Sequence, residues 1–195
     1  MFRPVGDVNA SLPPPDSSEI YVRRAVLDEV DALTAIARRE VGPTTAPADV
    51  VRRVMNHNTE GFFTVLHARP GPMPAEIIGF YGYLMLNLPG VEAILSGGFD
   101  GLGPDLSMLC SERDTPAALY GWCAVARGVN KWARPLVMKQ LSGPRYQGLD
   151  FYYRAVTEDG LRAIIKLGCV PARPGEAPAR GCIMVKRANP AAKAA

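Results

Sequence analysis

The sequence has few of the side chains that bind transition metals. It contains two histidines, His57 and His67. It contains four cysteines, Cys110, Cys123, Cys169 and Cys182. No two of them form a C-x-x-C pair. A zinc site normally needs a set of such ligands at short, recurring spacings. We therefore expect no metal site. We expect Cys123 and Cys169, which lie among apolar residues, to be buried thiols.

Long hydrophobic runs are also missing. No apolar segment approaches the roughly 18 residues of a membrane-spanning helix, and the first residues lack the apolar core of a signal peptide. The sequence thus predicts no membrane span and a cytoplasmic location.

A strong excess of one charge is missing as well. There are 22 Lys and Arg against 19 Asp and Glu, which gives a formal net charge of +3 at pH 7. The basic residues are spread along the chain without a basic stripe interleaved with aromatics, so nucleic acid is not an expected partner. A mild positive balance is equally compatible with small anionic partners.

The sequence does contain enough hydrophobic residues, 48% of 195, for one folded domain. Residues 1–18 include Pro4, Pro13, Pro14 and Pro15 and have little periodicity, which predicts an extended or disordered arm. Residues 188–195 are of low complexity and are expected to form a flexible tail. Residues 19–187 remain as the domain.

The first half of the domain combines alternating apolar residues with helical spacing. The expected elements, in order, are a strand at Ile20–Ala25, a helix N-capped by Asp28 and ended by Gly42-Pro43, a helix at Ala48–Asn56, and antiparallel strands at Gly61–Ala68 and Glu76–Leu88. The glycine-rich connection that follows, residues 90–116, is longer than a hairpin loop. It is either an insertion or a strand that periodicity does not resolve.

The second half has a clearer order of elements. The expected elements are a buried strand at Ala117–Ala126, a glycine-containing loop, a helix N-capped by Asn130 and ended by Gly143, a strand at Leu149–Val156, a helix N-capped by Thr157 and ended by Gly168, and a terminal hairpin of Val170–Pro171 with Gly181–Arg187. We expect the strand at Ala117–Ala126 to be central. We expect it to diverge from Leu149–Val156 instead of pairing along its whole length.

This order of strand, loop, helix, strand and helix, together with the segment GLRAIIKLGCVP, resembles the GNAT (GCN5-related N-acetyltransferase) superfamily. The resemblance implies an α/β (α+β) fold with a mixed, mainly antiparallel sheet flanked by helices. It also implies transfer of an acetyl or longer acyl group from acyl-CoA to an amine, with acyl-CoA as substrate. The acceptor would be a small molecule or a protein amine, acyl carrier protein is a further partner, and a homodimer stays open.

The resemblance also implies a coenzyme A site at the glycine-containing loop, where backbone N–H groups and a helix N-terminus favour phosphate. The implied cofactor-binding residues are Ala124, Val125, Arg127, Gly128, Val129, Asn130, Lys131 and Ala133. A cation at a helix N-terminus opposes the macrodipole. The charges of Arg127 and Lys131 are therefore expected to act on a bound anion and not on the fold.

The chain departs from the family pattern at two places. The family's usual loop reads Arg/Gln-x-x-Gly-x-Gly/Ala, but here Lys131 and Trp132 occupy the middle. The family's frequent tyrosine acid, four residues before the helix-ending glycine, is Ile164 here. These departures indicate a divergent member. They keep open the alternative of a non-catalytic GNAT-like binding or regulatory module.

Amine acylation needs a base for the ammonium proton and an acid for the leaving thiolate. The candidate bases are the acidic residues of the long connection, Glu92, Asp100 and Asp105, of which Glu92 is selected. Tyr120 and Tyr153 are the selected acids, and Tyr152 and Tyr153 must face opposite sides of the sheet. All of these residues also have ordinary roles, since loop acids are usually solvated and strand tyrosines usually belong to the core.

Overall fold

The computed structural model describes residues 19–69, 73–126 and 128–188, so the expected arm at 1–18 and nearly all of the expected tail lie outside the described residues. A single sheet of seven strands forms the centre, in the order β1-β2-β3-β4-β5-β7-β6. The strands are β1 (Ile20–Arg24), β2 (Phe62–His67), β3 (Glu76–Leu86), β4 (Ala118–Val125), β5 (Asp150–Arg154), β6 (Val170–Pro171) and β7 (Ile183–Lys186).

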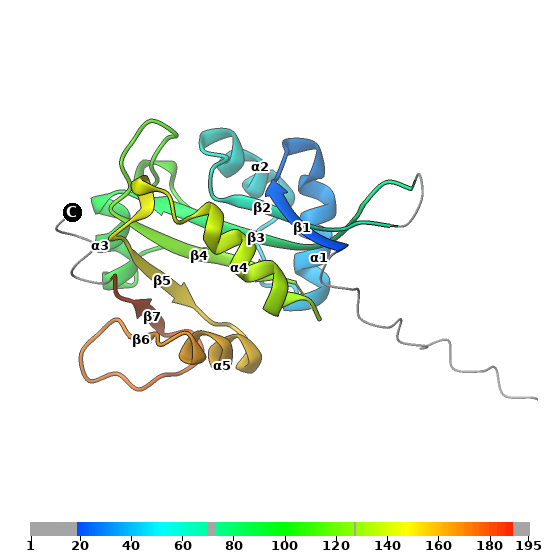
Figure 1. Ribbon diagram of the computed structural model, residues 1–195. Helices are drawn as coiled ribbons and strands as arrows, with labels where there is room; N and C mark the ends of the chain where they lie inside the picture. The colour runs from blue at the N-terminus through cyan, green and yellow to red at the C-terminus, as the bar shows by residue number, and fades with distance from the viewer. Residues whose placement is uncertain (1–18, 70–72, 127, 189–195) are drawn as a thin grey trace, which may run out of the picture.

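Helices cover both faces of this sheet (Figure 1). They are α1 (Val30–Val41), α2 (Ala48–His57), α3 (Leu88–Ser96), α4 (Asn130–Gln140) and α5 (Glu158–Lys166). The apolar core beneath α1, α2 and α3 includes Leu33, Val54 and Ile94. The core beneath α4 includes Ala133 and Val137, and a smaller cluster lies beneath α5. The structure is therefore a three-layer α/β arrangement, in which helices flank the sheet as the sequence predicts.

The strand pairings are antiparallel except for β4 and β5, which run parallel. A parallel pair needs a crossover, and α4 provides it across the face of the sheet. The expected terminal hairpin is confirmed, because β6 pairs with β7 in the register Val170 with Val185. The mixed, mainly antiparallel sheet predicted from the element order is confirmed as well.

Local capping signals were reliable at one helix and misleading at another. Thr157 is the N-cap of α5, and its hydroxyl accepts a hydrogen bond from the backbone N–H of Gly160 at 3.0 Å. Asp28, however, lies inside a short 3-10 turn, and Glu29 is the N-cap residue of α1. The Glu29 carboxylate accepts from Thr64 at 2.8 Å and also pairs with Arg23, so contacts with two strands decide where this helix begins.

The long connection at 90–116 is neither a structureless insertion nor a strand. Its start forms α3, which follows β3 after Asn87, and the Asn87 side chain caps α3 by accepting from Gly90 N–H at 3.0 Å. Leu106–Met108 forms a 3-10 turn farther along. The connection therefore returns over the sheet and packs Ile94 and Phe99 into the core.

None of the described helices is both long and apolar enough to cross a membrane.

Gly61, at the turn before β2, offers a direct test of how closely the backbones pack. Its carbonyl accepts from Tyr83 N–H at 2.9 Å, and a Cβ at this position would lie 1.8 Å from the Tyr83 carbonyl oxygen. The Tyr83 carbonyl belongs to the backbone of β3, and the backbone of Gly61 is hydrogen-bonded to it, so a Cβ at Gly61 could be accommodated only by disturbing β3. We predict that Gly61→Ala lowers the free energy of unfolding by about 3 kcal/mol in urea denaturation.

Gly143→Ala is the matched control. Gly143 has φ −63° and ψ 161°, and nothing lies within 4 Å of a Cβ built there. Alanine accepts this conformation, so this variant should be neutral or gain up to about 1 kcal/mol. Equal stability of the two variants would contradict the packing account.

Candidate functional site

The site is built where β4 and β5 stop pairing. Their parallel ladder runs from Ala118–Asp150 to Gly121–Tyr153 and goes no further, although β4 continues to Val125. The last part of β4 and the end of β5 therefore separate. The expectation that these strands diverge is confirmed.

A β-bulge lies on β4 at the same level. Gly82 pairs with Cys123 and Tyr83 pairs with Gly121, which leaves Trp122 as the extra residue. A bulge increases local twist and re-aims side chains. The Trp122 indole N–H donates to the Gly101 carbonyl at 2.5 Å, and its ring meets Phe62 edge-on with centroids 6.0 Å apart. The bulge thus ties the centre of the sheet to the loop that follows α3.

A cavity of about 440 Å³ lies at this divergence. Its walls come from α1, the α1–α2 loop, α2, β3, the loop after α3, β4, the end of β5 and α5. Most of the wall is apolar or aromatic, including Phe80, Trp122 and Ile164. The lining also contains residues with a hydroxyl or a charged side chain, which are Thr34, Thr44, Thr45, Asp100, Tyr120, Tyr153, Arg154 and Thr157. An apolar cleft with a few polar groups is the usual form of a small-molecule site.

Two of the three selected catalytic residues meet in this cavity. Tyr120 is buried, and a Cβ built on Gly101 would lie 3.7 Å from its hydroxyl oxygen. Burial raises the pKa of Tyr120, and the charge of Arg154 opposes that effect. Burial raises the pKa of Tyr153 much further. Both phenols therefore keep their protons at neutral pH.

Glu92 does not join them. It is exposed on α3 and is not among the residues that line the cavity. Asp100, from the same connection, does line the cavity, and its Oδ1 accepts from Leu102 N–H at 2.8 Å. The structure therefore brings a different carboxylate to the tyrosines. Asp105 caps a 3-10 turn outside the cavity lining by accepting from Ser107 N–H at 2.9 Å.

The loop between β4 and α4 holds the other predicted residues. Arg127 lies outside the described residues. Gly128 has φ 76°, in the left-handed region that favours glycine, so the chain can turn sharply from strand to helix. Ala124 lines the cavity, whereas Val125, Val129 and Ala133 are buried.

Asn130 is not the N-cap of α4. Val129 occupies that position without a side-chain cap, and Asn130 is the first helical residue. The side-chain oxygen of Asn130 accepts a hydrogen bond from the Tyr81 hydroxyl and so is committed to the sheet. The N-terminus of α4 therefore has neither a side-chain cap nor an acidic residue in its first turn.

Two cations lie near this helix end. The Lys131 ammonium is 4.0 Å from the centroid of the Trp132 ring. The half-buried Arg134 is close enough that its charge lowers the pKa of Tyr81, Tyr83 and Tyr153, against the larger effect of burial. The region combines a positive dipole end with side-chain cations, and this combination favours an anion.

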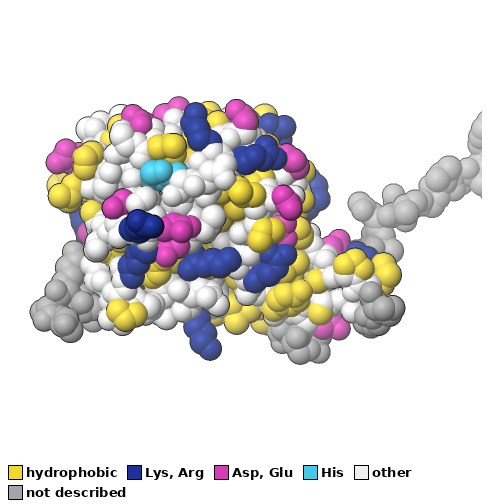
Figure 2. Space-filling view, turned by 90° about the horizontal axis from the view of Figure 1, so that it is seen from above, with side chains coloured by type: hydrophobic (Ala, Val, Ile, Leu, Met, Phe, Trp, Pro, Cys, Tyr) yellow, Lys and Arg dark blue, Asp and Glu magenta, His cyan; other side chains and the backbone are white. Residues whose placement is uncertain are grey.

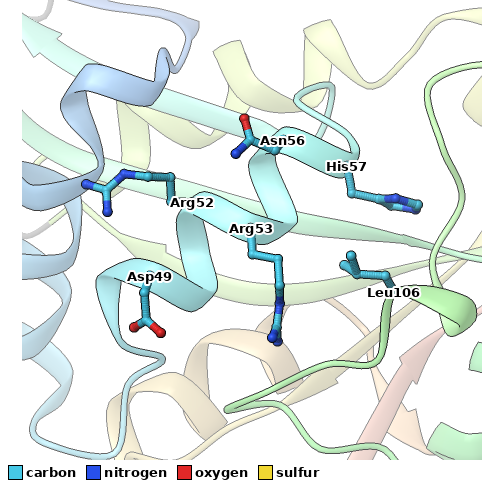
Figure 3. Close-up of a pocket in the computed structure, with 6 residues that line it drawn as sticks. All are labelled: Asp49, Arg52, Arg53, Asn56, His57 and Leu106. Atoms are coloured by element: carbon cyan, nitrogen blue, oxygen red, sulfur yellow. The ribbon is translucent and has the colours of Figure 1, made fainter.

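A second hollow, of about 500 Å³, lies on the outer side of α2 (Figure 3). Its lining is Asp49, Arg52, Arg53, Asn56, His57 and Leu106. It is a shallow surface depression, and Arg52 points away toward α1, where it pairs with Asp31 at 3.1 Å. The view from above shows cationic and anionic side chains interspersed, without a single basic stripe (Figure 2). The cavity at the strand divergence is therefore the better candidate site, although its volume is slightly smaller.

Among the described residues, no group of three or more His, Cys, Asp or Glu side chains is placed to hold a metal ion.

Comparison with known proteins relates the fold to solved structures. No family model matches the sequence, and no curated protein is significantly similar to it. Similar solved structures include Arabidopsis thaliana NAA60 in complex with acetyl-CoA, with a TM-score of 0.55 and 17% identity over 86% of this chain and 99% of that one. The GNAT-like decarboxylase GphF in complex with isobutyryl-CoA has a TM-score of 0.52 and 17% identity over 85% and 96%. The loading GNATL domain of CurA from Lyngbya majuscula has a TM-score of 0.54 and 10% identity over 85% and 95%.

The chain has the GNAT fold.

Within this GNAT fold, sequence reasoning missed Trp122 and Arg154, and it named Asp100 without selecting it. The extra residue of a bulge has no signal of its own in an apolar strand. Asp100 is followed by a glycine, which is typical of an ordinary turn. Tertiary contacts bring this turn to the cleft, namely the Trp122–Gly101 hydrogen bond and the packing of Phe99 against Tyr120. Arg154 ends a strand, where arginines are usually solvated.

Cys123 lines the cleft of this GNAT fold and provides a direct test of its polarity. Burial raises the pKa of Cys123 to about 12, so the thiol keeps its proton at pH 8. An ordinary thiol has a pKa of about 8.5, which makes the thiolate of Cys123 rarer by a factor on the order of 10³, and higher nucleophilicity recovers only about 30-fold of this. We predict that iodoacetamide alkylates Cys123 at least about tenfold more slowly than N-acetylcysteine at pH 8.

Peptide mass spectrometry measures the alkylation of each cysteine separately. The same protein in concentrated urea is the control, because the unfolded chain should restore an ordinary rate at Cys123. Rapid alkylation of Cys123 in the folded protein would show that the cleft is polar and open at this point.

Proposed function

We propose that this protein is an N-acyltransferase that uses acyl-CoA. One observation carries the proposal: two adjacent parallel strands part at an apolar cavity, and β4 leads from there through a short loop to a helix N-terminus that has no side-chain cap and no acidic residue in its first turn. The parted strands offer a slot for the thin pantetheine arm, and the helix end offers a place for the pyrophosphate. The GphF and NAA60 structures, which have the same fold, are complexes with isobutyryl-CoA and acetyl-CoA.

In this proposal the coenzyme lies along the free edge of β4 and turns at the loop before α4. Backbone groups of Ala124 and Val125 face the pantetheine, and the segment from Gly128 to Ala133 holds the phosphates. Lys131 contributes charge from the first turn of α4, and Arg127, which lies outside the described residues, stays a candidate from the sequence. We add Arg134, because it combines partial burial with a position beside the parted strands.

The reaction forms one C–N bond and breaks one C–S bond. A base first takes a proton from the acceptor's ammonium group, and the amine lone pair then attacks the thioester carbonyl carbon. The C–S bond breaks, and the thiolate takes a proton from an acid to give free coenzyme A. Positioning of the two substrates in one cleft supplies much of the acceleration, and acid–base assistance adds to it.

Tyr153 is the proposed acid. Its ring covers Gly121 at the point where the strands part, and a Cβ on Gly121 would lie 2.5 Å from that ring. Its raised pKa keeps the phenol protonated at neutral pH, so the hydroxyl can donate a hydrogen bond to the sulfur as the C–S bond breaks. Tyr120 packs on the other face of the sheet, close to Gly101, and is the second candidate.

Asp100 is the proposed base, acting directly or through water, because it is the carboxylate among the residues that line the cavity. Glu92, the residue selected from sequence, could take part only if the acceptor reached α3. The proposed acceptor class is an amine.

A non-catalytic GNAT-like module is the second candidate. Ile164 lines the cavity at the position where the family often has a tyrosine, and it cannot donate a proton. This alternative predicts a protein that binds coenzyme A without turnover, or one that binds no coenzyme A at all.

Thermal unfolding with acetyl-CoA, isobutyryl-CoA and free coenzyme A tests the proposed site. An acyl-CoA at 100 times its Kd should add about 2.7 kcal/mol to the free energy of unfolding. The double variant Lys131→Ala/Arg134→Ala should bind coenzyme A at least about tenfold more weakly, a change of about 1.4 kcal/mol. Its own melting temperature should stay within a few degrees of the parent, because cations near a helix N-terminus do not stabilise the helix.

Lys139→Ala, in the last turn of the same helix, is the matched control for loss of positive charge. It should leave the affinity for coenzyme A unchanged. Absence of any thermal shift with all three compounds would contradict the proposed coenzyme site.

Substitution of the two cavity tyrosines tests the chemistry. We predict that Tyr153→Phe lowers kcat for release of coenzyme A about 100-fold and leaves KM for acyl-CoA nearly unchanged, because only the proton is lost. Tyr120→Phe should lower kcat less than about fivefold. A larger loss with Tyr120→Phe would transfer the acid role to Tyr120.

A further inference from the structure

Arg154 is a cationic residue in the lining of a mostly apolar cavity. It is the last residue of β5 and pairs with Ile183 of β7. Its Nε is buried and has no hydrogen-bond partner. No ion pair joins Arg154 to another of the described residues.

The side chain faces the α1–α3 layer. Tyr152 belongs to the core on that face, and residues two apart in a strand share a face. The charge of Arg154 also acts on Tyr120, which belongs to the same core. The guanidinium therefore lies on the side of the sheet opposite α4.

A buried guanidinium N–H without a partner is unfavourable, because it has lost its water without gaining a hydrogen bond. Most of the cavity wall is apolar or aromatic. Asp100 is the carboxylate in the lining, but it binds Leu102 N–H and makes no ion pair with Arg154. Arg154 thus lines the cavity with a guanidinium fork whose buried Nε–H has no partner.

A carboxylate fits this fork, because its two oxygens can accept two parallel hydrogen bonds from a guanidinium. A phosphate fits less well. The nearby N-terminus of α5 is already capped by Thr157, and it carries Glu158 and Asp159 in its first turn, which repel a dianion.

We propose that Arg154 binds a substrate carboxylate, and that the acceptor is an amine that also carries a carboxylate, as amino acids do. The carboxylate lies on Arg154, and the ammonium group lies toward Asp100. This inference rests on the proposed function, since it defines the acceptor of the same cleft. The carboxylate belongs to the acceptor and not to the acyl group, because Arg154 faces the α1–α3 layer and the proposed coenzyme loop precedes α4 on the other face.

The test compares the twenty standard amino acids with their α-carboxamides, which keep the amine and lose the carboxylate. Release of coenzyme A from acetyl-CoA is measured for each compound, and binding of each without coenzyme A is measured by calorimetry. We expect kcat/KM to be at least about tenfold higher for the best amino acid than for its amide. The amide has the more acidic ammonium group and is intrinsically the more available nucleophile, so this order requires recognition of the carboxylate.

Arg154→Gln should abolish this preference by lowering kcat/KM for the amino acid at least about tenfold and leaving the amide within about twofold. Arg154→Lys, which keeps the charge without the fork, should be intermediate. Arg162→Gln on the exposed side of α5 removes the same charge and should change nothing. The melting temperature of Arg154→Gln should be equal to or above that of the parent, because a buried donor without a partner is removed.

Each other outcome overturns a specific statement. Equal use of amino acids and amides, by the parent and by Arg154→Gln, would refute the carboxylate site and leave the acyltransferase proposal intact. A preference for succinyl-CoA over acetyl-CoA that is lost in Arg154→Gln would place the carboxylate on the acyl group and refute the acceptor assignment. Amino acid binding that depends on Arg154, in a protein that neither binds nor turns over any acyl-CoA, would support the carboxylate site and refute the proposed function.

Discussion

The contact between Tyr153 and Gly121 determines the shape of the cavity at the strand divergence. These residues form the last pair of the parallel ladder, and the tyrosine ring takes the space that any side chain at position 121 would need. A residue with a Cβ there would displace the ring, and the ring is part of the cavity wall. The cavity, the proposed acid and the end of the ladder therefore depend on one glycine, because close packing in a sheet leaves no spare volume for a methyl group.

Elements whose signals are local were predictable from the sequence. Strand alternation identified β1, and the hydroxyl of Thr157 identified the start of α5, because a cap needs only the next three residues. The divergence of β4 and β5 followed from the order of elements and was confirmed. Coarse architecture can be predicted in this way because each of these signals agrees with the tertiary structure.

The errors share one cause, which is that distant residues decide local structure. Asparagine is a favoured N-cap residue, but the Tyr81 hydroxyl from β3 donates a hydrogen bond to the side chain of Asn130. Residues 88–96 contain a proline and a glycine and do not look helical. A Cβ on Gly90 would lie 2.2 Å from the Met108 carbonyl oxygen, so tertiary packing and not helix propensity explains that glycine. Nothing in the sequence singles out Arg154, because its Nε–H lacks a partner only in the folded structure, at the point where β4 and β5 separate.

The short β4–β5 ladder also divides the sheet mechanically. Everything from β5 to β7, including α5, is joined to the rest of the sheet along four residue pairs of a parallel ladder, the weaker of the two pairing modes. Such a seam is a natural hinge, since a small rotation about it changes the separation of strands beyond Gly121 without breaking a hydrogen bond. The core contacts of Tyr152, Ile183 and Val185 with the helices on one face limit that rotation. Entry of the proposed coenzyme into the slot, and its release, would then depend on the stiffness of this seam.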